Sequence, residues 1–273
     1  MRNPVETFEV AAVQLSTQGD VEESLAAVRS MVLQAAGRGA RLVVLPEEAA
    51  TMGSEREKRE IAASLEPGGR VFDALSEAAR DAKTWLIAGG IPEKSDDPKR
   101  PYNTCAVFSP DGSLAASYRK IHLFEIDLPD GTRHLESRTR SPGCEPCCVD
   151  IEGIRVGLSI CYDLRFPELY RRLGEMGADV VVIPAAFTVT TGKDHWQVLL
   201  RARAIENQVY VVAAAQFGTH PHRTTFGKSM IIDPWGAIVA QCSDGVGICY
   251  HTLNMEYLKD VRRSLPVLQH RRL

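Results

Sequence analysis

Apolar runs of strand length alternate with amphipathic helical segments along most of this 273-residue chain, and this alternation constrains its fold more than any other feature. The first run, residues 8–15, precedes an apolar helical face over residues 25–35, and a second run follows at 42–45. A helix at 71–82 and a strand at 85–89 continue the pattern. Later strands and helices are expected at residues 154–160, 167–176, 180–183, 196–207 and 210–214. The sequence therefore predicts an α/β fold.

Two hairpins and one long loop interrupt this alternation. Residues 102–108 and 114–119 flank a Pro-Asp-Gly-Ser turn, and a final hairpin turns at residues 233–236 before a helix that Asn254 caps. Residues 121–147 contain three prolines, two glycines and many charges, and are expected to form a long loop. Because long ordered loops in compact domains are usually functional, we expect this loop to contribute to a site.

Residues 39–46 and 177–184 resemble each other at an offset of 138 positions. In each segment a Gly-Ala pair at the end of a helix leads into a buried, Val-rich strand that stops at proline. The similarity indicates two similar β-α-β halves whose sheets pack face to face with helices outside, although so common a helix-to-strand transition also recurs by coincidence. The chain length suits one hydrophobic core, so we expect a single domain over residues 1–273.

Composition excludes several classes of protein. The 44% apolar and 25% charged residues are typical of a globular chain, and 35 acidic against 32 basic residues give no reason to expect nucleic acid or an anionic membrane as a partner. The longest mostly apolar stretch, residues 178–189, is too short to span a bilayer, and the N-terminus lacks an apolar secretion signal. Seven cysteines suit reduced thiols better than a disulfide framework, so we expect a cytoplasmic protein.

Three candidate chemical groups follow three different predicted strands. Cys161 comes after the strand at 154–160, the Glu47–Glu48 pair follows the strand at 42–45, and Lys120 ends the first hairpin. Alone, a buried cysteine is usually a small hydrophobic residue, and a glutamate or lysine is usually a surface group. Strand ends of an α/β sheet can converge on one edge, however, where ligands bind. A carboxylate there could act as a base, and a helix N-terminus and a lysine would lower the pKa of the thiol.

Other motifs give weaker signals. Cys144, Cys147 and Cys148 lack the further ligands that zinc needs, so no metal is expected. The glycines within residues 37–39 precede a strand, where they end a helix and do not cradle a phosphate, and no Gly-x-Ser-x-Gly elbow of a serine hydrolase occurs. The basic loop at 220–223 is either a solvated surface or a contact for an anionic substrate.

Three segments together resemble the nitrilase superfamily of carbon–nitrogen hydrolases, and the resemblance extends over essentially the whole chain. The segments are Leu45–Glu47, Tyr118–Phe124 and Cys161–Glu168. The separations of 73 and 41 residues between Glu47, Lys120 and Cys161 are also typical of that family. The resemblance implies a four-layer αββα sandwich, a Glu-Lys-Cys catalytic triad and a second catalytic glutamate between the lysine and the cysteine, at Glu136.

The resemblance also implies a mechanism without metal or cofactor, in which the glutamate deprotonates the cysteine and the thiolate forms a thioester with an amide substrate. Lys120 and the backbone N–H of Tyr162 would form the oxyanion hole. Arg165 matches an arginine that grips a substrate carboxylate, and Thr191 matches a position that adds a hydroxyl hydrogen bond. Glu48 departs from the pattern by doubling the glutamate, so the base is assigned by register with the Leu-Pro-Glu motif.

Within the superfamily the chain resembles the amidase branch that contains omega-amidase and deaminated glutathione amidase. The segments that carry this likeness are residues 190–196, 201–208, 214–220 and 229–236. The last two segments are closer to deaminated glutathione amidase, so the expected reaction is hydrolysis of a small ω-amide, deaminated glutathione, to 2-oxoglutarate and cysteinylglycine. His220, His222 and Arg223 would then meet the far carboxylate of this long substrate.

Several alternatives stay open at this point. An omega-amidase acting on 2-oxoglutaramate or 2-oxosuccinamate, a nitrilase proper and an N-carbamoyl hydrolase would use the same triad. A protein that kept the fold as a catalytically silent interaction module is a further alternative. The family's dimers pair through helical faces, and the mixed-polarity helix at 196–207 supplies such a face, so we expect a homodimer or higher homo-oligomer.

Overall fold

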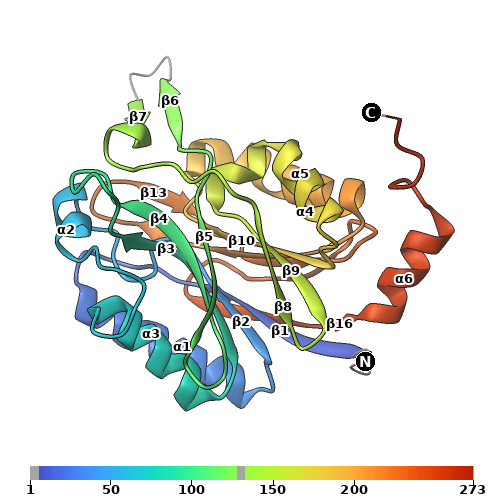
Figure 1. Ribbon diagram of the computed structural model, residues 1–273, viewed down its shortest axis with the longest axis horizontal. Helices are drawn as coiled ribbons and strands as arrows, with labels where there is room; N and C mark the ends of the chain where they lie inside the picture. Colours follow the sequence, from blue (N-terminus) through green and yellow to red (C-terminus); the bar gives the residue numbers. More distant parts are fainter. Residues whose placement is uncertain (1–5, 128–132, 273) are drawn as a thin grey trace.

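Two six-stranded β-sheets, packed face to face, form the centre of the computed structural model, which describes residues 6–127 and 133–272 (Figure 1). Sheet 1 consists, in spatial order, of β16 (Gly247–Asn254), β1 (Thr7–Gln14), β2 (Leu42–Leu45), β3 (Trp85–Glu93), β4 (Tyr102–Phe108) and β5 (Leu114–Arg119). Sheet 2 consists of β8 (Cys147–Ile151), β9 (Ile154–Leu158), β10 (Val180–Ala185), β11 (Tyr210–Ala215), β14 (Met230–Ile232) and β15 (Ile238–Gln241).

Helices cover the outer faces of both sheets, as Figure 1 shows. Helices α1 (Val21–Gly37) and α3 (Arg70–Ala82) cover sheet 1, and α4 (Pro167–Glu175) and α5 (Val189–Asn207) cover sheet 2. This layering follows because successive side chains of a strand point to opposite faces of the sheet, and apolar side chains here are buried on both faces. On β1, Val10 and Ala12 belong to a buried cluster shared with sheet 2, whereas Ala11 and Val13 belong to a cluster shared with α1 and α3. The four-layer αββα sandwich is therefore confirmed.

The two sheets have the same topology. In sheet 1, β1, β2 and β3 are parallel neighbours. The antiparallel β16 lies beside β1 at one edge, and the antiparallel β4 and β5 lie beside β3 towards the other edge. In sheet 2, β9, β10 and β11 are parallel neighbours in the same way. The antiparallel β8 lies beside β9 at one edge, and the antiparallel β14 and β15 lie beside β11 towards the other edge. The similar segments at 39–46 and 177–184 lead into β2 and β10, which occupy the same place in their sheets. The similarity in sequence thus reflects two similar halves.

The sheets approach each other closely beside the ends of β2 and β10. A Cβ atom at Gly89 would lie 2.1 Å from Cβ of Pro184, and one at Gly90 would lie 2.3 Å from the backbone nitrogen of Glu48. The register of β3 against β4 shifts at this glycine pair, and Gly90 has a φ of +75°. Only glycines fit this bulge, because a side chain would push apart the segments that hold the candidate site.

Most predicted elements are confirmed, including both hairpins and the caps of the first and last helices. The Asp20 carboxylate accepts the backbone N–H of Glu23, and Asn254 caps α6 (Met255–Ser264) by accepting from Tyr257. Helix α5 begins at Val189, earlier than predicted. The sequence missed α2 (Glu55–Glu60), a 3-10 helix η2 (Cys161–Arg165) and the ribbon of β12 (Phe217–Thr219) and β13 (Thr224–Phe226).

The predicted loop at 121–147 is not irregular throughout. It contains β6 (Glu125–Asp127), β7 (Arg133–Leu135) and a 3-10 turn, η1 (Glu136–Arg138), and β8 begins at its last residue. Strands β6 and β7 pair in a ribbon that projects from the sheets (Figure 1). Such short strands lie within a Pro- and Gly-rich segment, which hides their pattern.

In the part of the chain that the structure describes, no helix has the length and apolar character that crossing a bilayer requires.

Candidate active site

Glu47, Lys120, Glu136 and Cys161 all line one cavity of about 220 Å³. Glu47 follows β2 and Lys120 follows β5, both in sheet 1, whereas Cys161 follows β9 of sheet 2. Glu136 opens η1, in the segment that connects the two halves. The convergence predicted from strand ends is therefore present in the fold, with each sheet supplying part of the cavity.

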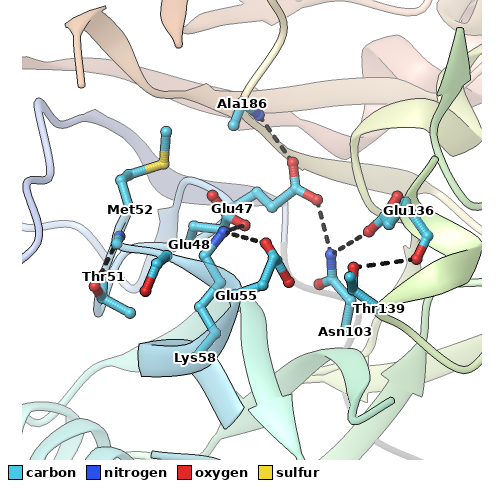
Figure 2. Close-up of polar contacts among 12 residues, drawn as sticks. Glu47, Glu48, Thr51, Met52, Glu55, Lys58, Asn103, Glu136, Thr139 and Ala186 are labelled. Carbon is cyan, nitrogen blue, oxygen red and sulfur yellow. Dashed lines mark hydrogen bonds and ion pairs between the residues drawn. The ribbon is translucent and has the colours of Figure 1, made fainter. Parts of the chain in front are cut away.

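Glu47 is 4% exposed, and three groups hold its carboxylate in place. One oxygen, Oε1, accepts from Lys120 Nζ at 3.0 Å and from Asn103 Nδ2 at 2.9 Å. The other, Oε2, accepts the backbone N–H of Ala186 at 3.0 Å. Figure 2 shows Glu47 between Asn103 of β4 and Ala186, which follows β10. The carboxylate is thus fixed between the two sheets, in one orientation.

Lys120 is buried between two carboxylates. Its ammonium donates to Glu136 Oε2 at 2.9 Å and to Glu47 Oε1 at 3.0 Å. Burial alone would lower the pKa of Lys120, but Glu136 and Glu47 raise that pKa well above its ordinary value. Glu136 also accepts the backbone N–H of Phe124 at 2.6 Å, and Lys120 and this bond outweigh burial and lower the pKa of Glu136. Lys120 and Glu136 therefore both carry charge at neutral pH.

Cys161 is 8% exposed and has a φ of +48°, in the left-handed region that non-glycine residues rarely adopt. Burial and the Glu47 carboxylate raise the pKa of the Cys161 thiol well above its ordinary value, and Lys120 only partly offsets them. The lowered thiol pKa expected from the sequence is therefore wrong, because the thiol is buried beside a carboxylate. At neutral pH the thiol is protonated and needs a base to become a nucleophile.

Asp163, fully buried two residues after the cysteine, connects η2 to the segment that bears the lysine. Its Oδ2 accepts the Tyr118 hydroxyl at 2.7 Å and the Ile160 backbone N–H at 2.9 Å. Its Oδ1 accepts the backbone N–H of His122 at 3.0 Å and lies 2.7 Å from Nδ1 of the same histidine. The His122 ring stacks on Phe166 at 3.7 Å between ring centroids. One carboxylate thus fixes Lys120 and Cys161 relative to each other.

The expected oxyanion-hole residue Tyr162 and three of the expected substrate-binding residues, Arg165, Thr191 and Arg223, line the same cavity. The Arg165 guanidinium lies 3.2 Å from Nδ1 of His195 and over the rings of Phe187 and Tyr162, at 5.3 and 5.7 Å from their centroids. Thr191, in the first turn of α5, lies 3.3 Å from the Thr188 hydroxyl, measured between the two oxygens. These contacts leave the cationic edge of Arg165 at the cavity wall.

The basic loop at 220–223 does not act as one surface. His220 is buried, with its ring nitrogens 2.6 Å from the Thr17 carbonyl oxygen and 2.7 Å from the Thr225 hydroxyl, and burial lowers its pKa. His222 is exposed, and neither histidine is among the residues that line the cavity. The expectation that both histidines meet the substrate is therefore corrected. Of the three side chains, only that of Arg223 lines the cavity.

Glu48 has different partners from Glu47. Its backbone has a φ of +58°, and its carboxylate accepts from Lys58 Nζ at 2.6 Å and pairs with Arg223. Burial would raise the pKa of Glu48, but Arg223 and Lys58 outweigh burial and lower that pKa from 4.5 to about 2. The doubled glutamate therefore supplies a second, separate carboxylate, which is charged at neutral pH and paired with two cations.

Sequence reasoning missed three further residues near the candidate catalytic groups. Asn103 donates to Glu47 and, at 3.3 Å, to Glu136, so one amide orients both carboxylates. Its only sequence signal is a polar residue near the start of a mostly apolar strand. His134 and the buried Arg140 also line the cavity, from the segment predicted as a loop.

A metal site was not expected, and no cluster of three or more His, Cys, Asp or Glu side chains suited to a metal occurs among the described residues. The cysteines at 144, 147 and 148 are free thiols, and the first of them is exposed.

A model of the carbon–nitrogen hydrolase family matches residues 9–263. The chain is 44% identical over 265 residues to deaminated glutathione amidase of Synechocystis sp., covering 96% of this chain and 97% of that protein. It is 39% identical over 267 residues to omega-amidase NIT2 of Danio rerio, covering 97% of this chain and 95% of that protein.

The solved structures agree with this assignment. The crystal structure of Saccharomyces cerevisiae Nit3, described as a member of branch 10 of the nitrilase superfamily, matches with a TM-score of 0.87 and 32% identity over 99% of this chain and 98% of that one. With a family match over nearly the whole chain, and a buried Glu-Lys-Cys group in its cavity, the chain belongs to the carbon–nitrogen hydrolase family and is a hydrolase of carbon–nitrogen bonds.

Proposed function

We propose that this enzyme is an amidase that hydrolyses deaminated glutathione to 2-oxoglutarate and cysteinylglycine. The observation that carries the proposal is the buried Glu47–Lys120–Glu136 group beside Cys161, in a cavity that also has Arg165 and Arg223 in its wall. A substrate with a carboxylate at each end and an amide between them matches two arginines around one nucleophile. The relative in Synechocystis is itself named deaminated glutathione amidase.

In the first half of the proposed reaction, Glu47 takes the proton of the Cys161 thiol as the sulfur attacks the amide carbonyl carbon. The carbonyl oxygen gains negative charge, which the Lys120 ammonium and the backbone N–H of Tyr162 stabilise. Tyr162 lies in the first turn of η2, where backbone N–H groups have no partner within the helix. One such oxyanion donor contributes roughly 3–4 kcal/mol to the transition state. Protonated Glu47 then donates to the leaving amine, and a thioester remains on Cys161.

In the second half, Glu47 takes a proton from a water molecule that attacks the thioester. The tetrahedral intermediate collapses, the proton returns from Glu47 to the Cys161 sulfur, and the acid product leaves. One carboxyl group thus serves as base and acid in turn, which requires that it stay in one place. The bonds from Asn103 and Ala186 supply that fixed position, and Glu136 keeps Lys120 aimed at the carbonyl oxygen.

Single substitutions test this mechanism. Cys161→Ser and Glu47→Gln should each lower kcat at least about 1000-fold while the circular dichroism spectrum stays that of the wild type. Cys144→Ser is the matched control, because Cys144 is exposed and outside the cavity, and it should keep wild-type activity. Near-normal turnover by folded Cys161→Ser would remove the assignment of the nucleophile.

The substrate is tested by comparing kcat/KM of the wild-type enzyme for deaminated glutathione and for 2-oxoglutaramate. We expect a preference for deaminated glutathione. A preference of tenfold or more for 2-oxoglutaramate, about 1.4 kcal/mol, would instead make the enzyme an omega-amidase, the second candidate. That alternative has a specific support, since the Danio rerio relative is named omega-amidase.

We also propose that the enzyme is a homodimer of the cytoplasm. Val198 and Ile205, 66% and 46% exposed, lie two turns apart on α5, and Trp235 is 59% exposed in the neighbouring β14–β15 turn. The Gly236 backbone lies close to the Ile205 side chain, and we call Val198, Ile205 and Trp235 together the α5 face. Sedimentation at micromolar concentration should give about twice the 30.0 kDa chain mass or a multiple of it. Seven free thiols support the reducing compartment.

A further inference from the structure

Five charged side chains form a cluster beside the cavity, apart from the catalytic group. Two are carboxylates, Glu48 and Glu55, and three are cations, Lys58, Arg140 and Arg223. Figure 2 shows Glu48, Glu55 and Lys58 on the α2 side of Glu47. All members except Lys58 line the cavity that contains Cys161. We call these five residues the remote cluster.

Ion pairs connect the remote cluster from end to end. Arg223 pairs with Glu48, whose other oxygen lies 2.6 Å from Lys58 Nζ. Lys58 also pairs with Glu55 at 3.2 Å, and the second oxygen of Glu55 lies 2.5 Å from an Arg140 nitrogen. The side chains of Lys58 and Arg140 are each only 5% exposed, and that of Glu48 is 11% exposed. Packing and pairing therefore fix the cations in place before any ligand arrives.

Charge does not balance within the remote cluster. Three cations meet two carboxylates, which leaves a net charge of +1; Lys58, Arg140 and Glu48 are largely buried, whereas the side chains of Arg223 and Glu55 are 24% and 41% exposed. The catalytic carboxylates do not supply the missing contact, because Glu47 and Glu136 are bonded to Lys120, Asn103 and backbone N–H groups. In the described residues, Nε of Arg223 is buried without a hydrogen-bond partner. A buried donor of this kind gains most from an anionic acceptor.

The remote cluster and Arg165 belong to different walls of the cavity. Arg165 is at the end of η2 and contacts His195 of α5 and Phe187. Arg223 comes from the β12–β13 connection and contacts Glu48 and Met52 of the segment that follows β2. A substrate that reaches both walls has room for one anionic group at each.

We propose that Arg223 and Arg140, held by Glu48 and Glu55, form a subsite for a carboxylate on the leaving amine of the substrate. This subsite rests on the proposed function, and it assigns the residues that select amides whose amine product is itself an acid, such as a short peptide with a free C-terminus. Primary amides, which release ammonia, leave the subsite empty. Arg165 keeps its place at the acyl end of the substrate.

The test compares two substrates that differ only at the leaving group. One is deaminated glutathione, and the other is the same molecule with the glycine carboxylate converted to a carboxamide. The wild-type enzyme should favour the carboxylate by about 10- to 100-fold in kcat/KM, the range expected for hydrogen bonds to a charged group. In Arg223→Met this ratio should fall towards one. Arg56→Met, an exposed arginine of α2 that pairs with Glu60, is the matched control and should keep the wild-type ratio.

Glu48→Gln separates a ligand role of Arg223 from a merely structural one. The amide keeps the shape of Glu48 but raises the charge of the remote cluster, so the preference for the carboxylate should stay or increase. If Arg223 only balances Glu48, Arg223→Met should lower turnover of the two substrates alike and keep the wild-type ratio, and the subsite would be refuted.

A measurement on the wild-type enzyme covers the case in which these variants do not fold. Cysteinylglycine should inhibit competitively about 10-fold or more better than cysteinylglycinamide. Equal inhibition, or equal kcat/KM for the two substrates, overturns the subsite while the proposed function stands. Failure of the wild-type enzyme to hydrolyse either amide removes the proposed function itself.

Discussion

At the scale of single residues, Asp163 is the side chain whose loss should do most damage without touching the substrate. Each oxygen of its carboxylate accepts one backbone N–H, from Ile160 on one side and from His122 on the other. An asparagine in either orientation would turn its NH₂ group towards one of these fixed donors. We predict that Asp163→Asn lowers the free energy of unfolding by about 2–4 kcal/mol, because a buried donor loses its acceptor.

The same substitution should lower kcat by about tenfold or more, since Cys161 and Lys120 are no longer held at a fixed separation. Urea denaturation and steady-state kinetics measure the two effects. Asp81→Asn is the control, because Asp81 forms an exposed ion pair with Arg29 that contributes less than about 1 kcal/mol. If Asp163→Asn loses no more stability than this control, the connecting role of the carboxylate is wrong.

Glu48 gives a prediction about pH. The pKa of Glu48 is lowered from 4.5 to about 2 in the folded protein, because the charges of Arg223 and Lys58 outweigh the effect of burial. A lowered folded-state pKa stabilises the protein above pH 4.5, and this stabilisation is lost as the pH falls towards 2. This pKa shift of Glu48 contributes about 3 kcal/mol to the free energy of unfolding at neutral pH.

The variant Glu48→Gln should therefore be less stable than the wild type at pH 7, and the difference should narrow by about 1–2 kcal/mol at pH 3.5. Urea denaturation of both proteins at the two pH values measures this narrowing. A difference that stays constant with pH would show that Glu48 acts through its shape and not through its charge.

Residue identity and position predicted much of the site, but not the partners that orient it. Glu47, Lys120 and Cys161 could be placed together because each follows a strand, and strand ends meet at a sheet edge. Asn103 and Arg140 lacked such a signal, since their partners are more than thirty positions away. Three-dimensional packing also decided the thiol pKa, which burial raises and which the sequence suggested would be lowered.

At the scale of elements, the bulge in β3 should be sensitive to a single methyl group. A Cβ atom at Gly89 would lie 2.1 Å from Cβ of Pro184 on β10, and neither backbone can move without separating the sheets. We predict that Gly89→Ala lowers the free energy of unfolding by about 2–3 kcal/mol, the cost of overpacking a dense interior. Gly19→Ala is the control, because no atom lies within 4 Å of a Cβ there. Equal stability of the two variants in urea would contradict the close approach.

The elements that the sequence predicted best are those long enough to show a clear periodic pattern of apolar residues. Helices α1 and α3 and the buried strands of both sheets have clear apolar patterns, and their bounds differ by few residues from expectation. The start of α5 was missed because Thr190–Lys193 contains weak helix formers and a glycine. Short elements such as η2 and β6 have too few residues to show any period, and tertiary contacts determine them.

At the scale of the whole molecule, the repeated topology explains why the site lies where it does. In each half the carboxyl ends of the parallel strands lie along one edge of the sheet. Packing the two sheets face to face brings these two edges together. The proposed base and lysine come from sheet 1 and the nucleophile from sheet 2. Neither half alone contains the three groups, so the proposed chemistry depends on how the sheets are packed.

The last prediction concerns assembly through the α5 face. Val198 and Val246 are both exposed valines, 66% and 58%, but Val198 lies in the middle of α5 whereas Val246 lies between β15 and β16. In a dimer that buries the α5 face, Val198→Glu would place a charge in an apolar contact, and the dimer dissociation constant should rise by tenfold or more, at least about 1.4 kcal/mol. Val246→Glu adds the same charge elsewhere and should leave assembly unchanged. Sedimentation over a range of concentrations measures both variants; equal dissociation constants would show that the dimer uses another surface.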